Sequence, residues 1–171
     1  MKTTLVKSLL IGILALAGML AGNAFAAQAT DQFQVQATVN ANCLVTANNL
    51  TFGTPYDGSS GTPNDSTTTI DVRCTKNTGY TIAMDAGVTA GTSFAPRLMT
   101  NATDFMQYNL YTDNTYGTVW GDGTGATGTV AGTGTGMGNT INHTVYGRIP
   151  VSQNLSPGTY TETTITVTVT Y

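Results

Sequence analysis

Residues 164–171 read TITVTVTY, with Ile165, Val167, Val169 and Tyr171 at every second position and threonine before each of them. In an extended chain, successive side chains point to opposite faces, so this alternation indicates one buried face and one face in water. Valine, isoleucine and threonine are β-branched and favour strands. The stretch therefore predicts a half-buried β-strand at the end of the chain.

The same two-residue period recurs upstream. Apolar residues stand two positions apart in short segments at 33–39, 50–52, 70–74, 80–84, 108–110 and 145–151. No stretch after residue 26 shows a sustained period of 3.6 residues, which a helix would require. Roughly seven short strands separated by turn residues predict an all-β protein, and a β-sandwich in particular.

The composition excludes several classes of protein. Only 9% of the 171 residues are charged, and the chain has 6 Lys+Arg, 9 Asp+Glu, one His and two Cys. So few cations cannot neutralise nucleic-acid phosphate, and no nucleic-acid partner is expected. One His and two Cys leave little material for a metal site. A hydrophobic fraction of 40% speaks against disorder driven by charge.

Residues 1–26 have the parts of a secretory signal peptide. Lys2 and Lys7 precede an apolar run at 9–20, and residues 24–26 read AFA, a small-x-small cleavage site. The run is shorter than the roughly 20 residues that a membrane-spanning helix needs. We expect cleavage after Ala26, which leaves a mature chain of 145 residues with a net charge of −5, enough for one domain.

Cys43 and Cys74 are the only two cysteines of the chain. In an exported protein an even count predicts a disulfide, here closing a loop of about 31 residues and contributing roughly 3–4 kcal/mol. The spacing has no CxxC character, and the single histidine lies far away in the sequence. A structural disulfide is therefore favoured over a redox pair or a metal site.

A glycine-rich stretch at 121–138 contains the only motif that suggests a cofactor. Residues 123–128 read GTGATG, which matches GxGxxG, but residues 129–132 read TVAG and do not begin a helix. A dinucleotide site needs that helix to hold the pyrophosphate. We therefore expect a flexible surface loop that joins strands, and no cofactor.

Candidate catalytic residues are few and scattered. His143 shares a face with Ile141 and Val145 in an alternating stretch, without a serine or cysteine nucleophile nearby in sequence. Most aspartates stand beside Gly, Asn or Thr, where aspartate caps its own backbone in turns. The sequence therefore indicates no catalytic residues, no metal site and no enzyme activity.

The two ends of the mature chain carry the functional clue. Residues 159–171 contain neither Lys nor Pro, which usually protect an exposed edge strand. Residues 27–39 begin polar and then place four apolar residues at every second position: Phe33, Val35, Ala37 and Val39. Such a segment can add as a strand to a neighbouring subunit, in a head-to-tail contact that generates an open filament. An ordinary first strand of a complete sandwich is the alternative, and these residues alone leave both open.

An ordered set of motifs spans the mature chain. The motifs are Phe33-x-Val35-x-Ala37-x-Val39-x-x-x-Cys43, Leu50-x-Phe52-Gly53, Ile70-x-Val72-x-Cys74-Thr75, Tyr80-x-Ile82, Arg97-x-Met99, Leu110-Tyr111-x-Asp113, Trp120-Gly121-Asp122-Gly123, Tyr146-Gly147-Arg148-Ile149-Pro150, Gly158-x-Tyr160 and Ile165-x-Val167-x-Val169-x-Tyr171. Together they resemble the spore coat protein U family, which includes subunits of archaic chaperone–usher pili, such as Csu-type pili, and outer-coat proteins of spores. The long glycine-rich stretch at 121–138 departs from this resemblance.

The resemblance implies an incomplete immunoglobulin-like β-sandwich over residues 40–171 that lacks its last strand. A donor strand from a neighbouring subunit, residues 27–39, would complete it, with Phe33, Val35, Ala37 and Val39 as the inward side chains. The edge of the acceptor groove would be formed by Ile165, Val167, Val169 and Tyr171. The Cys43–Cys74 disulfide carries over.

The partners that the resemblance implies are further pilin subunits, a periplasmic chaperone and an outer-membrane usher. The protein would pass through the periplasm to a surface fibre that serves adhesion or biofilm formation. Two alternatives stay open: a structural protein of a spore coat, and a carbohydrate-binding adhesin module that uses Tyr111, Tyr116 and Trp120. The length of one domain favours a shaft subunit over a tip adhesin.

Overall fold

The computed structural model describes residues 26–53 and 55–171, so almost all of the expected signal peptide lies outside the described residues. The chain divides into two units, Met1–Ala37 and Thr38–Tyr171. Residues 26–42 contain no strand, and the side chains of Phe33, Val35 and Val39 are 82–88% exposed. Across the described ranges, we find no helix of the length and apolarity that crossing a membrane demands.

The unit Thr38–Tyr171 consists of strands, turns and irregular segments. The strands are β1 Cys43–Ala47, β2 Asn64–Cys74, β3 Gly79–Met84, β4 Arg97–Thr100, β5 Phe105–Tyr111, β6 Val119–Trp120, β7 Thr127–Gly128, β8 Val130–Thr133, β9 Ile141–Ile149 and β10 Val167–Thr170. These strands confirm the all-β prediction, and each of the longer ones coincides with an alternating or threonine-rich segment of the sequence.

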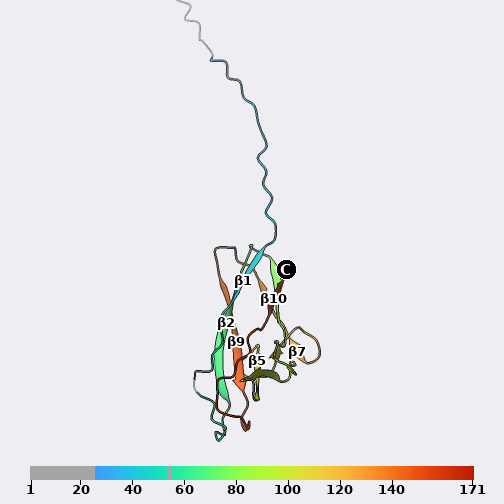
Figure 1. The fold of residues 1–171 in the computed structure, drawn as a ribbon. Coiled ribbons are helices and arrows are strands. Elements are labelled where there is room, and N and C mark those ends of the chain that lie inside the picture. Colours follow the sequence, from blue (N-terminus) through green and yellow to red (C-terminus); the bar gives the residue numbers. More distant parts are fainter. Residues whose placement is uncertain (1–25, 54) are drawn as a thin grey trace, which may run out of the picture. The chain divides into compact units, whose positions relative to one another are not determined.

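The strands form two sheets. The larger sheet has the order β1-β2-β9-β5-β6-β7, with β4 also paired to β5, and the smaller has the order β10-β3-β8. The long antiparallel pair of β2 and β9 runs from Asn64↔Ile149 to Val72↔Ile141 and forms the middle of the larger sheet (Figure 1). In this arrangement β1 is an edge strand of the larger sheet and β10 is an edge strand of the smaller one.

A single apolar core unites the two sheets. Its buried members come from both: Ile70, Val72, Cys74, Met99, Met106, Tyr108, Leu110, Trp120, Val145 and Ile149 from the larger sheet, and Tyr80, Ile82 and Met84 from the smaller. The indole Nε1 of Trp120 donates to the carbonyl oxygen of Ile82 at 3.1 Å and so crosses from one sheet to the other. The two layers therefore form a sandwich.

The expectation of a flexible loop at 121–138 is wrong for part of that stretch. It contains β7 and β8, and β8 pairs with β3 through Tyr80↔Gly132. A Cβ atom at Gly132 would overlap the ring of Tyr80, and one at Gly134 would overlap the backbone of Thr75. Glycine is required at 132 because the Tyr80 ring lies against the backbone, and at 134 because the backbone of Thr75 approaches closely, which is a different use of glycine from flexibility.

Residues 50–52 also differ from expectation, since they form no strand. Leu50 and Phe52 nevertheless pack against the core. A Cβ atom at Gly147 would lie 2.8 Å from Leu50 and 3.1 Å from Phe52, so both side chains lie directly over the backbone of β9. The alternation marks a segment that is half-buried but has no strand partner.

Candidate functional site

A groove of about 1410 Å³ opens into the sandwich. One wall comes from residues 47–53 and 55–58, which begin at the end of β1, and the other from residues 153–167, which lead into β10. The floor is apolar and consists of core side chains: Ile70, Met84, Met99, Met106, Tyr108, Leu110, Val145 and Ile149. The groove thus reaches down to the core, although its floor side chains are each no more than 8% exposed.

Both sheets present a free strand edge at this side of the sandwich. Within the described ranges, β1 pairs with β2 alone and β10 with β3 alone. The carbonyl oxygen of Thr166 accepts from the amide of Asp85 at 3.0 Å, and hydrogen-bonding direction alternates along an antiparallel strand. The N–H and C=O groups of Val167 and Val169 therefore point away from β3, towards the open edge.

Side chains, more than a strand ladder, hold the wall at residues 153–166. The Gln153 amide forms two hydrogen bonds with the backbone of Gln107, one from the Gln107 N–H at 2.7 Å and one to its carbonyl at 2.9 Å. This contact imitates a strand pair beyond the end of β9. The Tyr56 hydroxyl accepts from the Gln153 N–H at 2.8 Å and links the two walls.

Further along the same wall, the Asp104 carboxylate accepts from the amide of Ser156 at 2.7 Å. Hydrogen bonds from Ser156 hold the pKa of Asp104 below its usual value. A single bridge between Thr100 and Thr161 provides backbone pairing. The wall is therefore fixed at a few points, and it leaves the floor uncovered.

Of the four residues expected at the edge of the groove, two line it and two do not. Ile165 and Val167 line the groove. Val169 pairs with Ile82 and packs against the core outside the groove lining, and Tyr171 follows β10 with 57% of its surface exposed. The opposite wall contains Leu50, Phe52 and Tyr56, which were not expected at the groove; the Leu50-x-Phe52 spacing is the sequence signal that could have indicated it.

Cys43 and Cys74 form a disulfide, which confirms the pairing expected from the sequence. They are directly opposite each other at the start of β1 and the end of β2. The bond therefore joins the first residue of an edge strand to a strand in the interior of the larger sheet.

The aromatic residues considered for carbohydrate binding have other roles. Trp120 is fully buried. Tyr116 covers the Arg148 guanidinium at 3.4 Å and stacks edge-on against Tyr111 at 5.4 Å. These contacts attach the loop between β5 and β6 to the outer face of the larger sheet.

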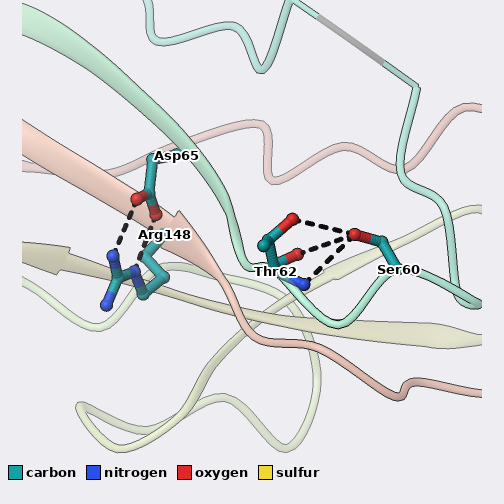
Figure 2. Close-up of polar contacts among 4 residues, drawn as sticks. All are labelled: Ser60, Thr62, Asp65 and Arg148. Atoms are coloured by element: carbon teal, nitrogen blue, oxygen red, sulfur yellow. Dashed lines mark hydrogen bonds and ion pairs between the residues drawn. The ribbon is translucent and has the colours of Figure 1, made fainter.

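Figure 2 shows the ion pair between Asp65 and Arg148, the arginine that Tyr116 of this loop covers. Arg148 donates to both carboxylate oxygens of Asp65 at 2.7 Å, from the facing position on β9. The hydrogen bonds from Arg148 lower the pKa of Asp65. Ser60 and Thr62 bond to one another in the turn that precedes β2, also drawn in Figure 2. This polar surface is internally satisfied and stabilises the sheet that carries the groove floor.

His143 contacts Tyr80 rather than a nucleophile, with 2.8 Å between its Nε2 and the tyrosine hydroxyl. It shares the inward face of β9 with Ile141 and Val145, as the alternation indicated. Burial lowers its pKa from 6.5. In the parts of the chain that the structure describes, no three His, Cys, Asp or Glu side chains are arranged to hold a metal ion.

An all-β sandwich with an uncovered core and two free strand edges defines an incomplete domain that has a site for an added strand. Comparison with known proteins agrees with this class. The chain belongs to the Spore Coat Protein U domain family, whose model matches residues 29–170. It is 32% identical to Protein U of Myxococcus xanthus over 176 aligned residues. The alignment covers 94% of this chain and 96% of that protein.

Its fold is similar to that of a chain in the crystal structure of the CsuC–CsuE chaperone–tip adhesion subunit pre-assembly complex, from the archaic chaperone–usher Csu pili of Acinetobacter baumannii. The TM-score is 0.53 at 22% sequence identity, over 78% of this chain and 40% of that chain. The chain thus spans less than half the length of that solved chain, and the likeness concerns the fold.

Proposed function

We propose that this protein is a structural subunit of an extracellular pilus, assembled by donor-strand exchange through a chaperone–usher pathway. The observation that carries the proposal is the groove, with an apolar floor and two walls that lack a strand between them. The occupant is residues 27–39 of a second copy. In this role the chain is a binding and building element, not an enzyme.

The segment 27–39 and the groove are chemically complementary. Phe33, Val35 and Val39 are exposed in the single chain, and each gains about 1.5–3 kcal/mol when fully buried. The outward N–H and C=O groups of Val167 and Val169 can pair with an added strand, which is how strand addition obtains its affinity. Side chains and backbone are thus satisfied by the same event.

The connection to β1 favours a second copy over self-insertion. Only residues 40–42, Asn-Ala-Asn, separate Val39 from Cys43 at the start of β1. They contain neither glycine nor proline for a tight reversal. Because donor and acceptor surfaces differ, exchange between copies is head-to-tail and extends into an open filament.

The apolar groove explains why a chaperone and an usher are proposed as partners. An open edge beside an exposed apolar groove is an aggregation hazard before assembly. A periplasmic chaperone would cover the groove during transit, and an outer-membrane usher would exchange it for the next subunit. The solved complex with the similar fold is named a chaperone–subunit pre-assembly complex, which supports this order of events. We propose export through the periplasm to a cell-surface fibre used in adhesion or biofilm formation.

Substitution in the donor segment tests the proposal. We expect the mature chain carrying Val35→Asp to remain unassembled, because a carboxylate in a dry groove is costly. Gln34→Asp is the matched control: it adds the same charge on the opposite face of the strand and should still allow assembly. Negative-stain microscopy and gel analysis of detergent-resistant oligomers give the readout. Fibres of Val35→Asp as abundant as those of the control would contradict the proposal.

A spore or cell coat built from the same subunit contacts is the second candidate function. The family description and the similarity to Protein U over nearly the whole chain favour it. Immunogold labelling of intact cells distinguishes the two, because a pilus projects beyond the surface whereas a coat forms a continuous layer.

A further inference from the structure

Methionine is concentrated in the floor of the groove. Three of the four methionines after residue 26, namely Met84, Met99 and Met106, line the groove. Their side chains are only 3–8% exposed. The fourth, Met137, lies in the turn between β8 and β9, away from the groove lining.

The three residues reach the floor from both sheets. Met99 on β4 and Met106 on β5 are opposite each other in the strand pairing, and Met84 comes from the end of β3. The rest of the floor includes the β-branched residues Ile70, Val145 and Ile149. The floor therefore combines unbranched thioether side chains, two of which are paired across β4 and β5, with β-branched ones.

These two kinds of side chain respond differently to an occupant. Methionine is unbranched and polarizable, and it repacks around irregular shapes. Isoleucine and valine are restricted at χ1, so a floor made from them has a more fixed shape. Overfilling a fixed apolar site is destabilising, whereas a floor that repacks accommodates the added volume.

We infer that Met84, Met99 and Met106 make the groove tolerant of donor-strand side chains of different size, and that they determine which subunits this one can accept. The inference rests on the proposed function. The partner that it identifies is a donor segment of a non-identical subunit that keeps the alternating pattern but differs in its inward side chains. Positions above Ile70, Val145 and Ile149 remain selective.

Peptide binding to the full mature chain tests the inference. The chain carries Val35→Asp so that its own segment cannot donate, and the probes are fluorescent peptides of residues 27–40. In these peptides Phe33, Val35, Ala37 and Val39 are each replaced in turn by a smaller and a larger apolar residue. We expect two classes of position, one where affinity changes less than about 3-fold and one where it falls more than about 10-fold.

Replacement of the methionines then removes the tolerance. Met84→Ile, Met99→Ile and Met106→Ile together keep the floor apolar with a residue that strands favour. We expect the tolerant positions to become selective by about 10-fold, measured for each altered peptide relative to the unchanged peptide on the same variant. Met137→Ile is the matched control and should leave the profile unchanged.

Methyl-labelled methionine spectra of the parent chain provide a readout that needs no floor variant. Peptide binding should shift the resonances of Met84, Met99 and Met106 and leave that of Met137 in place. If the three floor resonances do not shift on binding, the inference is overturned. The same peptide profile in the parent and in the isoleucine variant would also overturn it. Neither result would contradict the proposed function. Failure of the parent to bind any of the peptides would instead overturn the proposed function.

Discussion

Arg97 is a fully buried cation whose hydrogen bonds go to oxygen atoms from three segments. Its guanidinium donates to the carbonyls of Asp85 and Trp120 at 2.7 and 2.6 Å, and to the Asn109 side-chain oxygen at 2.8 Å. Burial lowers its pKa. The planar five-donor head of arginine suits such a site, because it can satisfy several acceptors at once.

Arg97→Met should lower the free energy of unfolding by about 3 kcal/mol, because it leaves buried acceptors without donors. Urea unfolding followed by fluorescence of Trp120 measures the loss. Arg73→Met, at an exposed position of β2, is the matched control and should change stability by less than about 0.5 kcal/mol. Equal losses of stability in the two variants would show that the buried hydrogen bonds of Arg97 do not stabilise the fold.

His143 gives the protein a defined pH dependence. Burial holds its folded-state pKa below 6.5, so the unfolded chain binds a proton that the folded chain resists. The free energy of unfolding should therefore be constant above the unfolded pKa and fall as the pH drops through about 6.5. Because the chain has one histidine, its NMR titration is unambiguous. A midpoint at or above 6.5 would refute this prediction.

At the scale of elements, the wall of the groove at residues 153–166 depends on a few side chains. Gln153 is the main tether, since its amide takes the place of a strand partner for Gln107. A wall of this kind is ordered enough to keep the groove open and has few backbone bonds to break when a strand enters. Segments with so few bonds tend to open locally.

Gln153→Ala should speed hydrogen exchange at the Gln107 amide by roughly 5-fold, because one hydrogen bond contributes about 1 kcal/mol. Hydrogen exchange followed by NMR makes the measurement. Gln107→Ala is the matched control, because the contact uses the backbone of Gln107 and not its side chain. Unchanged exchange in Gln153→Ala would show that the wall is held elsewhere.

Elements also show which parts of the fold the sequence could predict. Alternation identified β2, β3, β5, β9 and β10, because in each of them a strand has one face on the core. It could not identify β8, whose single glycine, Gly132, is explained only by the Tyr80 ring across the sheet. Nor could it locate the groove, because the wall that contains Leu50 has no strand partner and is held by packing and by hydrogen bonds from the side chains of Ser66 and Thr68.

For the whole molecule, a missing strand implies a domain that is less stable alone than when occupied. An occupant that binds the folded state alone raises stability by RT ln(1 + [L]/Kd), about 2.7 kcal/mol at a concentration of 100 Kd. The Cys43–Cys74 disulfide also raises the free energy of unfolding, but it does so by restricting the unfolded chain.

Cys43→Ala together with Cys74→Ala should therefore destabilise the mature chain by about 3–4 kcal/mol, for a sequence separation of 31. Urea unfolding of the chain that carries Val35→Asp, with and without the cysteines, measures the difference in the unassembled state. A loss below about 1 kcal/mol would indicate that the reduced unfolded chain is already compact.

The position of that disulfide has a mechanical consequence in the proposed fibre. A pulling force on the donor segment reaches the body of its subunit through residues 40–42 and arrives at Cys43, the first residue of β1. Without a crosslink the hydrogen bonds between β1 and β2 would carry the load alone. The bond to Cys74 passes the tension at once to β2, which β9 holds along nine residue pairs from Asn64↔Ile149 to Val72↔Ile141. The load is thus shared with the longest strand pair of the subunit.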